Sequence, residues 1–199
     1  MLRVYGDIVS GNCFKVRLLL ELLHRPYEWV HVDILKRQSR TPAFLAMNPN
    51  GRFPLLEFEP GAYLPESNAI LHFLAEGSDY LPQNRLAHAR VLQWMFFEQY
   101  PHEPYIATSR FWIKFLEQEH AYRDQLAERR EGGYAALAVM EQHLARAPYF
   151  AAERLTIADI ALYAYTHVAH EGGFSLAQYP AVRAWIERVK EDPGYVAMA

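Results

Sequence analysis

Residues 2–17, LRVYGDIVSGNCFKVR, carry the pattern that decides the fold of this chain. Leu2 to Tyr5 has the length and composition of a short apolar strand, and Gly6-Asp7 ends it. Helical periodicity follows, with apolar residues at spacings of three and four: Val16, Leu19, Leu20 and Leu23. A strand that leads through a short loop into a helix predicts the first unit of an α/β domain.

Strands and helices continue to alternate up to residue 76. The predicted elements are a strand at residues 27–32, a helix from Pro42 to the turn at 48–51, strands at 55–58 and 62–64, and a helix that Ser67 caps. The order is βαβαββα, in which the first two strands form a right-handed parallel crossover and the last two an antiparallel hairpin. This is the element order of a thioredoxin-like fold.

The remainder of the chain is helical almost to its end. Helices are predicted at residues 86–99, 105–115, 123–143, 156–170 and 182–190. We expect Pro101 and Pro104 to kink the chain between the first two of these helices, since proline disturbs a helix just before itself. The sequence therefore predicts a thioredoxin-like domain at 1–76, a linker at 77–85 and an all-α domain at 86–199.

Composition excludes several classes of protein. Hydrophobic residues make up 51% of the 199, and charged residues 22%, which is typical of a folded domain. One cysteine excludes an internal disulfide framework, and a net charge of −3 argues against nucleic-acid binding through bulk charge. No apolar run has the length of a signal peptide or a membrane span, so we expect a cytoplasmic protein without a membrane partner.

Ser10 and Cys13 lie where the first helix begins. A helix N-terminus offers unpaired N–H groups and a partial positive charge, which stabilise an anion such as a thiolate. Dithiol oxidoreductases of this topology have cysteines at these two positions. A serine cannot form a disulfide, but its hydroxyl can donate a hydrogen bond to a thiolate on another molecule. The alternative is that Ser10 only caps the helix and Cys13 only fills space.

Two further segments suggest a ligand site. Pro54 begins a strand, and in a thioredoxin-like fold such a proline is cis and faces the helix terminus, which leaves the Phe53 backbone available to a peptide ligand. An ordinary trans proline is the alternative. Glu66 and Ser67 open a helix, where a carboxylate and nearby donors would bind an amino-acid head group. A plain helix N-terminus with a favourable acidic residue is the alternative.

Across its whole length the chain resembles the glutathione S-transferase superfamily in four motifs. The first motif, Ser10 with Cys13 and Lys15-Val16-Arg17, is similar to the serine-type segment of the theta and zeta classes. The second, Asn50-Gly51-x-x-Pro54-x-Leu56, is similar to the cis-proline motif of the family. The third, ESNAI at 66–70, is similar to the motif that binds the γ-glutamyl group, and the fourth, TIAD at 156–159, is similar to the capping box of the second domain.

The resemblance implies an enzyme that binds glutathione as its co-substrate and activates the thiolate through Ser10 for attack on a hydrophobic electrophile. It also implies a homodimer. The implied glutathione-binding residues are Asn12, Gln38, Phe53, Pro54, Glu66 and Ser67, with Lys36 as an alternative to Gln38 for the glycine carboxylate. The aromatic residues Tyr105, Phe111 and Trp112 are candidates for the electrophile site, although helical spacing also suits them to core packing.

Other functions stay open. Asn12 is similar to the asparagine of the nu class, in which disulfide-bond reductase activity occurs, so a glutathione-dependent disulfide reductase is one alternative. A non-catalytic binding module on the same fold is another. No metal is expected, because His167 and His170 have helical spacing but no evident third ligand.

Overall fold

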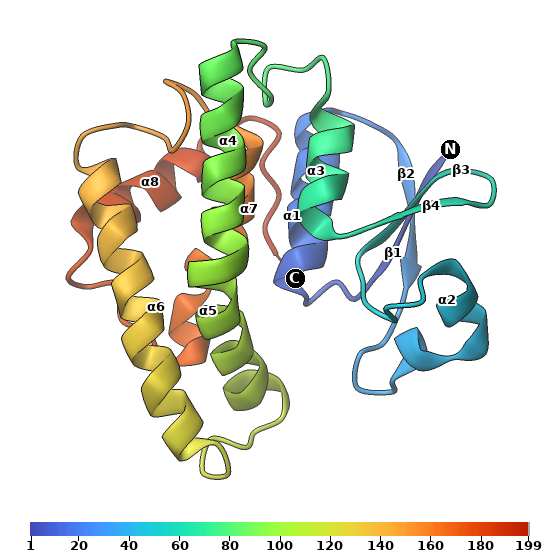
Figure 1. The fold of residues 1–199 in the computed structure, drawn as a ribbon, viewed down its shortest axis with the longest axis horizontal. Helices are drawn as coiled ribbons and strands as arrows, with labels where there is room; N and C mark the ends of the chain where they lie inside the picture. The colour runs from blue at the N-terminus through green and yellow to red at the C-terminus, as the bar shows by residue number, and fades with distance from the viewer. Residues whose placement is uncertain (199) are drawn as a thin grey trace. The chain divides into compact units, whose positions relative to one another are not determined.

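One mixed sheet organises the first third of the chain in the computed structural model, which describes residues 1–198. Its strands are β1 (Leu2–Gly6), β2 (Tyr27–His31), β3 (Leu55–Glu59) and β4 (Ala62–Pro65), in the order β2-β1-β3-β4 (Figure 1). β1 pairs with β2 in parallel and with β3 antiparallel, and β3 pairs with β4 antiparallel. The thioredoxin-like fold predicted from the sequence is confirmed.

Three α-helices complete this part: α1 (Gly11–Leu22), α2 (Pro42–Met47) and α3 (Ser67–Ala75), with a 3-10 turn, η1, at Gln38–Arg40. α1 and α3 pack side by side, and α2 lies apart from them beside the sheet (Figure 1). α2 begins at Pro42, as predicted, and the Thr41 side chain caps it. Phe44 of α2 packs in a cluster with Val32 and Leu55.

The C-terminal residues belong to this first unit. The chain divides into unit 1, which comprises Met1–Ser78 and the residues from Asp192 on, and unit 2, Asp79–Glu191. Arg17 Nη1 donates to the Ala197 carbonyl at 3.5 Å, and the Gly194 backbone lies against Leu22 of α1. The sequence prediction had assigned these residues to the helical domain, since their composition gives no sign of where they pack.

Unit 2 is helical, as predicted. Its elements are α4 (Arg85–Phe97), η2 (Glu98–His102), α5 (Glu103–Arg110), η3 (Phe111–Phe115), α6 (Arg123–Leu144), α7 (Ile157–Thr166), η4 (Ala169–Gly172) and α8 (Pro180–Lys190). Every residue of α7 is buried, which explains why this segment is apolar on all faces. No helix among residues 1–198 is long and apolar enough to cross a membrane.

The prolines widen the helix where the sequence predicted an interruption between residues 99 and 105. α4, η2, α5 and η3 follow one another without a gap, so that prediction was wrong. η2 is a π-helical turn that contains Pro101, and the Glu103 N–H donates to the Glu98 carbonyl five residues before it. Because proline has no N–H, a wider turn accommodates it without ending the helix.

Two adjacent glycines in α6 have a packing role. A Cβ at Gly132 would collide with the ring of Tyr105, and a Cβ at Gly133 would collide with the ring of Phe174. Each glycine thus lets an aromatic ring of unit 2 approach the α6 backbone closely, which offsets the weak helix propensity of glycine.

Candidate functional site

The sheet register brings three loops of unit 1 to one edge. Tyr5 in β1 pairs with Leu55 in β3, and Leu55 pairs with Pro65 in β4. Because β3 is antiparallel to both neighbours, the end of β1, the start of β3 and the end of β4 coincide. The loop before α1, the Phe53-Pro54 segment and the start of α3 therefore gather at the same place.

Ser10 is the N-cap of α1, as one of the two sequence interpretations expected. Its backbone is extended, and its Oγ accepts a hydrogen bond from the Cys13 N–H at 3.4 Å. The Ser10 N–H donates to the Asp7 carbonyl at 3.0 Å, which fixes the turn. The side chain is half-buried. A hydroxyl that accepts from the helix still has its own proton to donate, so capping and thiolate stabilisation are compatible.

Cys13 is fully buried in the same turn. Burial raises the pKa of the Cys13 thiol to about 12, against the opposing effects of hydrogen bonds from Ser10 and the Asp7 backbone. Its Sγ lies so close to Gly6 that any side chain there would collide with it. At neutral pH Cys13 is a buried thiol, and a nucleophile must be a thiolate, so this residue is unsuited to attack.

The Phe53-Pro54 peptide bond is cis, as expected for a thioredoxin-like fold. The preceding loop is held by Asn48, whose Nδ2 donates to the Arg52 carbonyl at 2.7 Å and whose Oδ1 accepts from the Asn50 N–H at 3.1 Å. Pro54 is buried, and the half-buried Phe53 side chain packs against the Val32, Phe44 and Leu55 cluster. The packing of the Phe53 side chain thus holds the Phe53-Pro54 segment against this hydrophobic cluster.

Glu66 and Ser67 differ from the predicted geometry. Ser67 is the first residue of α3, and Glu66 takes the cap position without a side-chain cap bond, so the prediction that Ser67 caps the helix was wrong. The Ser67 Oγ bonds across to α1 in place of capping its own helix: it donates to Asn12 Oδ1 at 3.1 Å. Glu66 is exposed, with φ of 72°, a left-handed conformation that is strained for a residue with a side chain.

Sequence patterns did not identify one polar residue that lies beside the start of α3. Lys15 of α1 is 0% exposed, and its Nζ lies 3.4 Å from both Ser67 Oγ and Asn68 Oδ1. A signal for it is present in the sequence, because helical spacing puts Lys15 on the apolar stripe that continues with Leu18, Leu19 and Leu22. A lysine in such a stripe indicates a buried charge.

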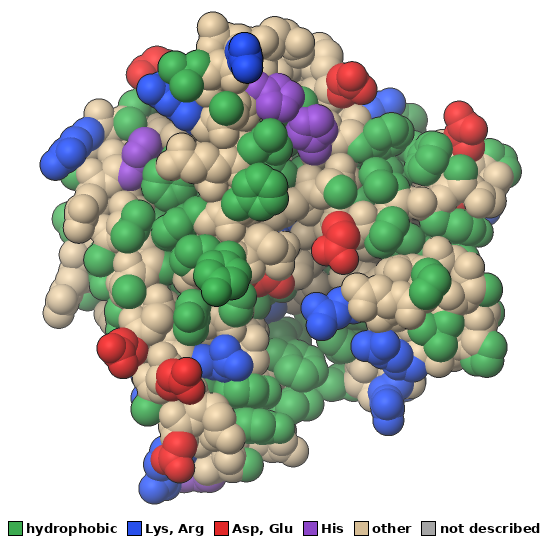
Figure 2. Space-filling model, in the orientation of Figure 1, with side chains coloured by type: hydrophobic (Ala, Val, Ile, Leu, Met, Phe, Trp, Pro, Cys, Tyr) green, Lys and Arg blue, Asp and Glu red, His purple; other side chains and the backbone are tan. Residues whose placement is uncertain are grey.

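Gln38 lies on a more exposed segment. It begins η1, and its Oε1 accepts from the Asp33 N–H at 2.7 Å. The same segment carries three exposed basic residues, Lys36, Arg37 and Arg40. Figure 2 shows Lys and Arg side chains gathered on the part of the unit 1 surface that faces the viewer. Lys36 Nζ pairs with Asp33 Oδ2 at 3.1 Å. This segment thus presents mainly positive charge.

The three aromatic candidates lie in unit 2, and each is half-buried. The Tyr105 ring packs against Gly132, and Phe111 lies 6.3 Å from Phe115 between ring centroids. Trp112 stacks on Tyr122 at 4.2 Å, and the Arg129 guanidinium lies 4.8 Å from the Trp112 ring centroid. The indole is therefore held between an aromatic ring and a cation within its own unit.

The histidine pair has no sign of a metal site. Within residues 1–198 no group of three or more His, Cys, Asp or Glu side chains is arranged to hold a metal ion. His167 Nδ1 donates to the Tyr163 carbonyl at 2.7 Å, and burial lowers the pKa of His167 to about 4. His167 is thus a neutral side chain that packs on the Tyr163 ring.

Comparisons with known proteins give one consistent family. Residues 4–80 match the model of the glutathione S-transferase N-terminal domain, and residues 123–188 match that of the C-terminal domain. A crystal structure of glutathione S-transferase from Pseudomonas fluorescens Pf-5 is 54% identical, covers 99% of this chain and 98% of that chain, and has a TM-score of 0.97.

Two more distant relatives bear on the chemistry. A glutathione transferase family member from the same Pseudomonas strain, solved with two glutathione molecules bound, is 27% identical, covers 97% of this chain and 89% of that chain, and has a TM-score of 0.85. The disulfide-bond oxidoreductase YfcG of Escherichia coli K12 is 29% identical over 92% of this chain and 88% of its own length.

Proposed function

The chain belongs to the glutathione S-transferase family, and we propose that it binds glutathione and stabilises the thiolate through Ser10 for attack on an electrophilic small molecule. The observation that carries this proposal is the Ser10 hydroxyl at the start of α1, in a turn that the Ser10 N–H bond to the Asp7 carbonyl fixes, beside a protonated, buried Cys13. This turn offers a hydroxyl donor and a helix N-terminus to a thiolate supplied from outside.

The magnitudes are adequate for thiolate activation. A free thiol has a pKa near 8.5, so about a few per cent is ionised at pH 7. Lowering that pKa by about two units requires roughly 2.7 kcal/mol. A hydrogen bond to a charged group contributes about 1.5–3 kcal/mol and a helix N-terminus about 0.3–1 kcal/mol. The thiolate then forms a carbon–sulfur bond with the electrophile, whose leaving group departs with the electron pair.

The rest of glutathione has matching groups around this turn. We assign the cysteinyl part to the backbone of Phe53 beside Pro54, and the γ-glutamyl part to Glu66 and Ser67. We place Asn12 beside the γ-glutamyl part, since it accepts the Ser67 hydroxyl hydrogen bond. Gln38, or the neighbouring Lys36, would meet the glycine carboxylate from the basic segment of η1. The glutathione-bound relative supports this co-substrate.

The electrophile is assigned to an apolar wall in unit 2. Tyr105, Phe111 and Trp112 are half-buried, so each ring keeps some surface for a ligand. Their packing partners within unit 2 hold the rings in place, and an aromatic lining favours hydrophobic compounds over polar ones.

Reduction of a disulfide is the second candidate function, and the YfcG relative favours it. In that reaction the bound thiolate attacks sulfur in place of carbon, one thiol leaves, and a second glutathione reduces the mixed disulfide. Cys13 is not needed, since only an external thiolate takes part. The same Ser10 turn serves both reactions.

Four measurements test the proposal and separate these alternatives. The protein should be retained on glutathione-agarose, and thiolate absorbance should report a lowered pKa for bound glutathione. Turnover of 1-chloro-2,4-dinitrobenzene or a similar aryl halide supports transfer, and turnover of 2-hydroxyethyl disulfide supports reduction. Glutathione binding without either turnover would support the binding module, and absence of glutathione binding would refute the proposal.

Glu66→Gln should weaken glutathione binding about fivefold, because an exposed carboxylate–ammonium pair contributes about 1 kcal/mol. Binding of glutaryl-cysteinyl-glycine, which lacks the γ-glutamyl amine, should hardly change. Calorimetry with both ligands makes the comparison. Glu76→Gln is the matched control, since Glu76 is exposed at the opposite end of α3 and should affect neither ligand. Equal losses for both ligands would refute the pairing of Glu66 with the amine.

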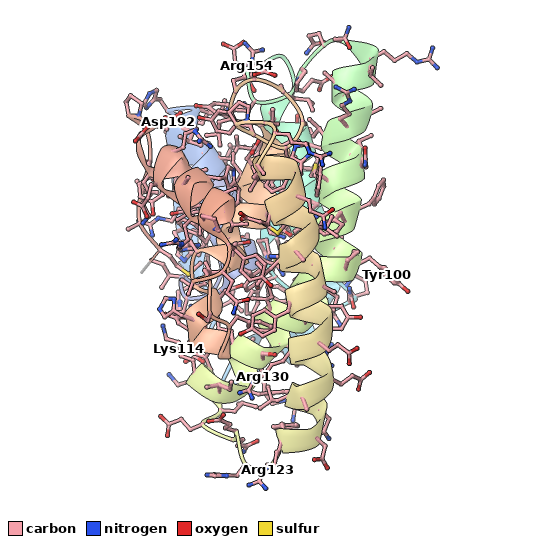
Figure 3. The ribbon with its side chains drawn as sticks, turned by 90° about the vertical axis from the view of Figure 1, so that its left-hand side faces the viewer. Tyr100, Lys114, Arg123, Arg130, Arg154 and Asp192 are labelled. Atoms are coloured by element: carbon pink, nitrogen blue, oxygen red, sulfur yellow. The ribbon has the colours of Figure 1, made fainter. Side chains whose placement is uncertain are left out.

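We also propose a homodimer, which apolar exposure in unit 2 supports. Phe96 and Tyr100 are 70% and 83% exposed one helical turn apart, and Val139 of α6 is 44% exposed. Figure 3 shows Tyr100 directed away from the helical bundle. Size-exclusion chromatography with light scattering should give twice the chain mass, and Tyr100→Glu should shift the protein towards monomer. A wild-type monomer at micromolar concentration would refute the dimer.

A further inference from the structure

Asp7 is a buried acid whose side chain has no part in the reaction proposed above. It directly follows β1, and it is 7% exposed. Both carboxylate oxygens accept hydrogen bonds from the backbone: Oδ1 from the Val9 N–H at 3.3 Å, and Oδ2 from the Ile34 N–H at 3.2 Å. An asparagine has nearly the same size but only one acceptor oxygen, so the two bonds account for a carboxylate at this position.

These two hydrogen bonds join two separate loops of unit 1. Val9 lies in the loop before α1, where the Asp7 carbonyl also accepts the Ser10 N–H at 3.0 Å. Ile34 lies in the segment between β2 and η1, 27 residues after Asp7 in the chain. One side chain thus holds the turn that carries the Ser10 hydroxyl against the segment that leads to Gln38.

The segment around Ile34 is itself connected to Gln38 by hydrogen bonds. The Arg37 N–H donates to the Ile34 carbonyl at 3.1 Å, and the Gln38 N–H donates to the Asp33 carbonyl at 3.2 Å. A displacement of Ile34 would therefore move the start of η1. Because Gln38 is assigned to the glycine carboxylate of glutathione, Asp7 connects the thiol end of the proposed site with its glycine end.

The negative charge of Asp7 opposes a thiolate, so the charge does not explain why an acid lies here. Burial is the main cause of the raised pKa of Cys13, and the Asp7 charge adds to it. A glutathione thiolate beside Ser10 would meet the same charge. Loss of the Asp7 charge alone would lower a thiol pKa in this turn, whereas loss of the positioning of Ser10 would raise it. The opposite signs make the two effects separable.

We propose that Asp7 is a positioning residue for thiolate activation: its carboxylate holds the Ser10 turn and the segment after β2 in one arrangement, and so aligns the Ser10 hydroxyl and Gln38 on the same glutathione molecule. This inference rests on the proposed function and adds what aligns the two ends of its site. Asp7 acts through the backbone of Val9, Ser10 and Ile34, without contact to the ligand.

A double-mutant cycle with Ser10 tests this role. Asp7→Ala should raise the pKa of the bound glutathione thiol by about one, which lowers the thiolate-to-thiol ratio, and with it turnover at lower pH, about tenfold. In a Ser10→Ala background Asp7→Ala should raise the pKa no further, because its effect passes through the Ser10 hydroxyl. Thiolate absorbance against pH, measured on the wild type and the three variants, gives the coupling. A constant or lower pKa in Asp7→Ala, or an equal rise in both backgrounds, would refute the role.

The glycine end has a readout of its own. Asp7→Ala should reduce the preference for glutathione over γ-glutamylcysteine, which lacks the glycine, by about threefold, the scale of one exposed carboxylate contact. Glu21→Ala is the matched control: Glu21 Oε1 accepts the Tyr27 hydroxyl at 2.8 Å, so this carboxylate also joins two elements of unit 1, but in the last turn of α1. It should lower the melting temperature and leave the thiol pKa and the preference unchanged. The same pKa rise in Glu21→Ala would mark a general loss of structure and refute a specific role of Asp7.

Asp7→Asn tests the role even if the alanine variant does not fold. Its single acceptor oxygen can hold only one of the two loops, so the thiol pKa should rise or the preference for glutathione should fall. If neither happens, the role of Asp7 is refuted while glutathione binding stands. If the wild type does not bind glutathione, or if Ser10→Ala leaves the thiol pKa unchanged, the proposed function itself fails.

Discussion

Ser10→Ala is expected to raise the pKa of the bound glutathione thiol towards its free value and to lower turnover by about ten- to a thousandfold. The Ser10 hydroxyl lies at the cap of α1, and the Ser10 N–H bond to the Asp7 carbonyl fixes the backbone of this turn. Thiolate absorbance measured against pH gives the pKa, and steady-state kinetics with saturating glutathione gives the turnover.

Capping must be separated from catalysis, because Ser10 does both. Loss of the Ser10 bond to the Cys13 N–H should cost about 1 kcal/mol of stability. The kinetics must therefore be measured well below the melting temperature of the Ser10→Ala variant. Ser10→Thr keeps a hydroxyl and a cap and should recover most of the thiolate stabilisation. A Thr variant as slow as the Ala variant would contradict a role for the hydroxyl.

Cys13→Ala is the companion variant, and it should keep most of the activity and leave the glutathione pKa nearly unchanged. The physical reason is the buried thiol, whose pKa of about 12 leaves it protonated throughout the working range. Mass spectrometry after incubation with oxidised glutathione should show no adduct. A stoichiometric adduct at Cys13, together with an inactive Cys13→Ala variant, would replace the Ser10 mechanism by protein-thiol transfer.

Local patterns predicted most of this fold. Periodicity and turn residues placed the four strands and nearly all helices, because each of those signals acts within a few residues. The sequence also predicted that Ser10 lies at the start of α1 and that the Phe53-Pro54 bond is cis, since both follow from position in a thioredoxin-like frame. Features that depend on a partner far away in the sequence could not be predicted from these local patterns.

Ser67 and Lys15 show that limit clearly. A serine at the start of a helix predicts a cap, yet Ser67 is the first residue of α3 and its hydroxyl bonds to Asn12, 55 residues earlier. Helical spacing puts Lys15 on an apolar stripe, but its partners Ser67 and Asn68 lie 52 and 53 residues later and cannot be read from that spacing. The π-helical turn at Pro101 was likewise hidden, since proline usually ends a helix and the wider turn depends on the packing of unit 2.

The second large effect concerns stability: Asp159→Ala should lower the free energy of unfolding by about 3 kcal/mol. Its buried carboxylate accepts four hydrogen bonds, from the Phe150 N–H, the Thr156 N–H and hydroxyl, and the Trp185 indole N–H, all between 2.8 and 3.1 Å. Removing it leaves these buried donors unpaired, at about 1–3 kcal/mol for each one that finds no other partner. Thr156→Ala removes one donor and should cost only about 1 kcal/mol.

The stability deficit of the Asp159→Ala variant, which is its loss of unfolding free energy relative to the wild type, should depend on pH, and this dependence gives the sharper test. Burial raises the pKa of Asp159 to about 6, against the opposing effect of the hydrogen bonds from Thr156, Phe150 and Trp185. Because the folded state holds this proton more tightly than the unfolded state, the Asp159 contribution to wild-type stability grows as pH falls from about 6 to 4. Denaturant unfolding should therefore show the Asp159→Ala deficit widening over that window. Asp124→Ala, an exposed acid in the first turn of α6, is the control and should change stability by less than about 0.5 kcal/mol. An unchanged melting temperature with collapsed turnover would instead make Asp159 part of the chemistry.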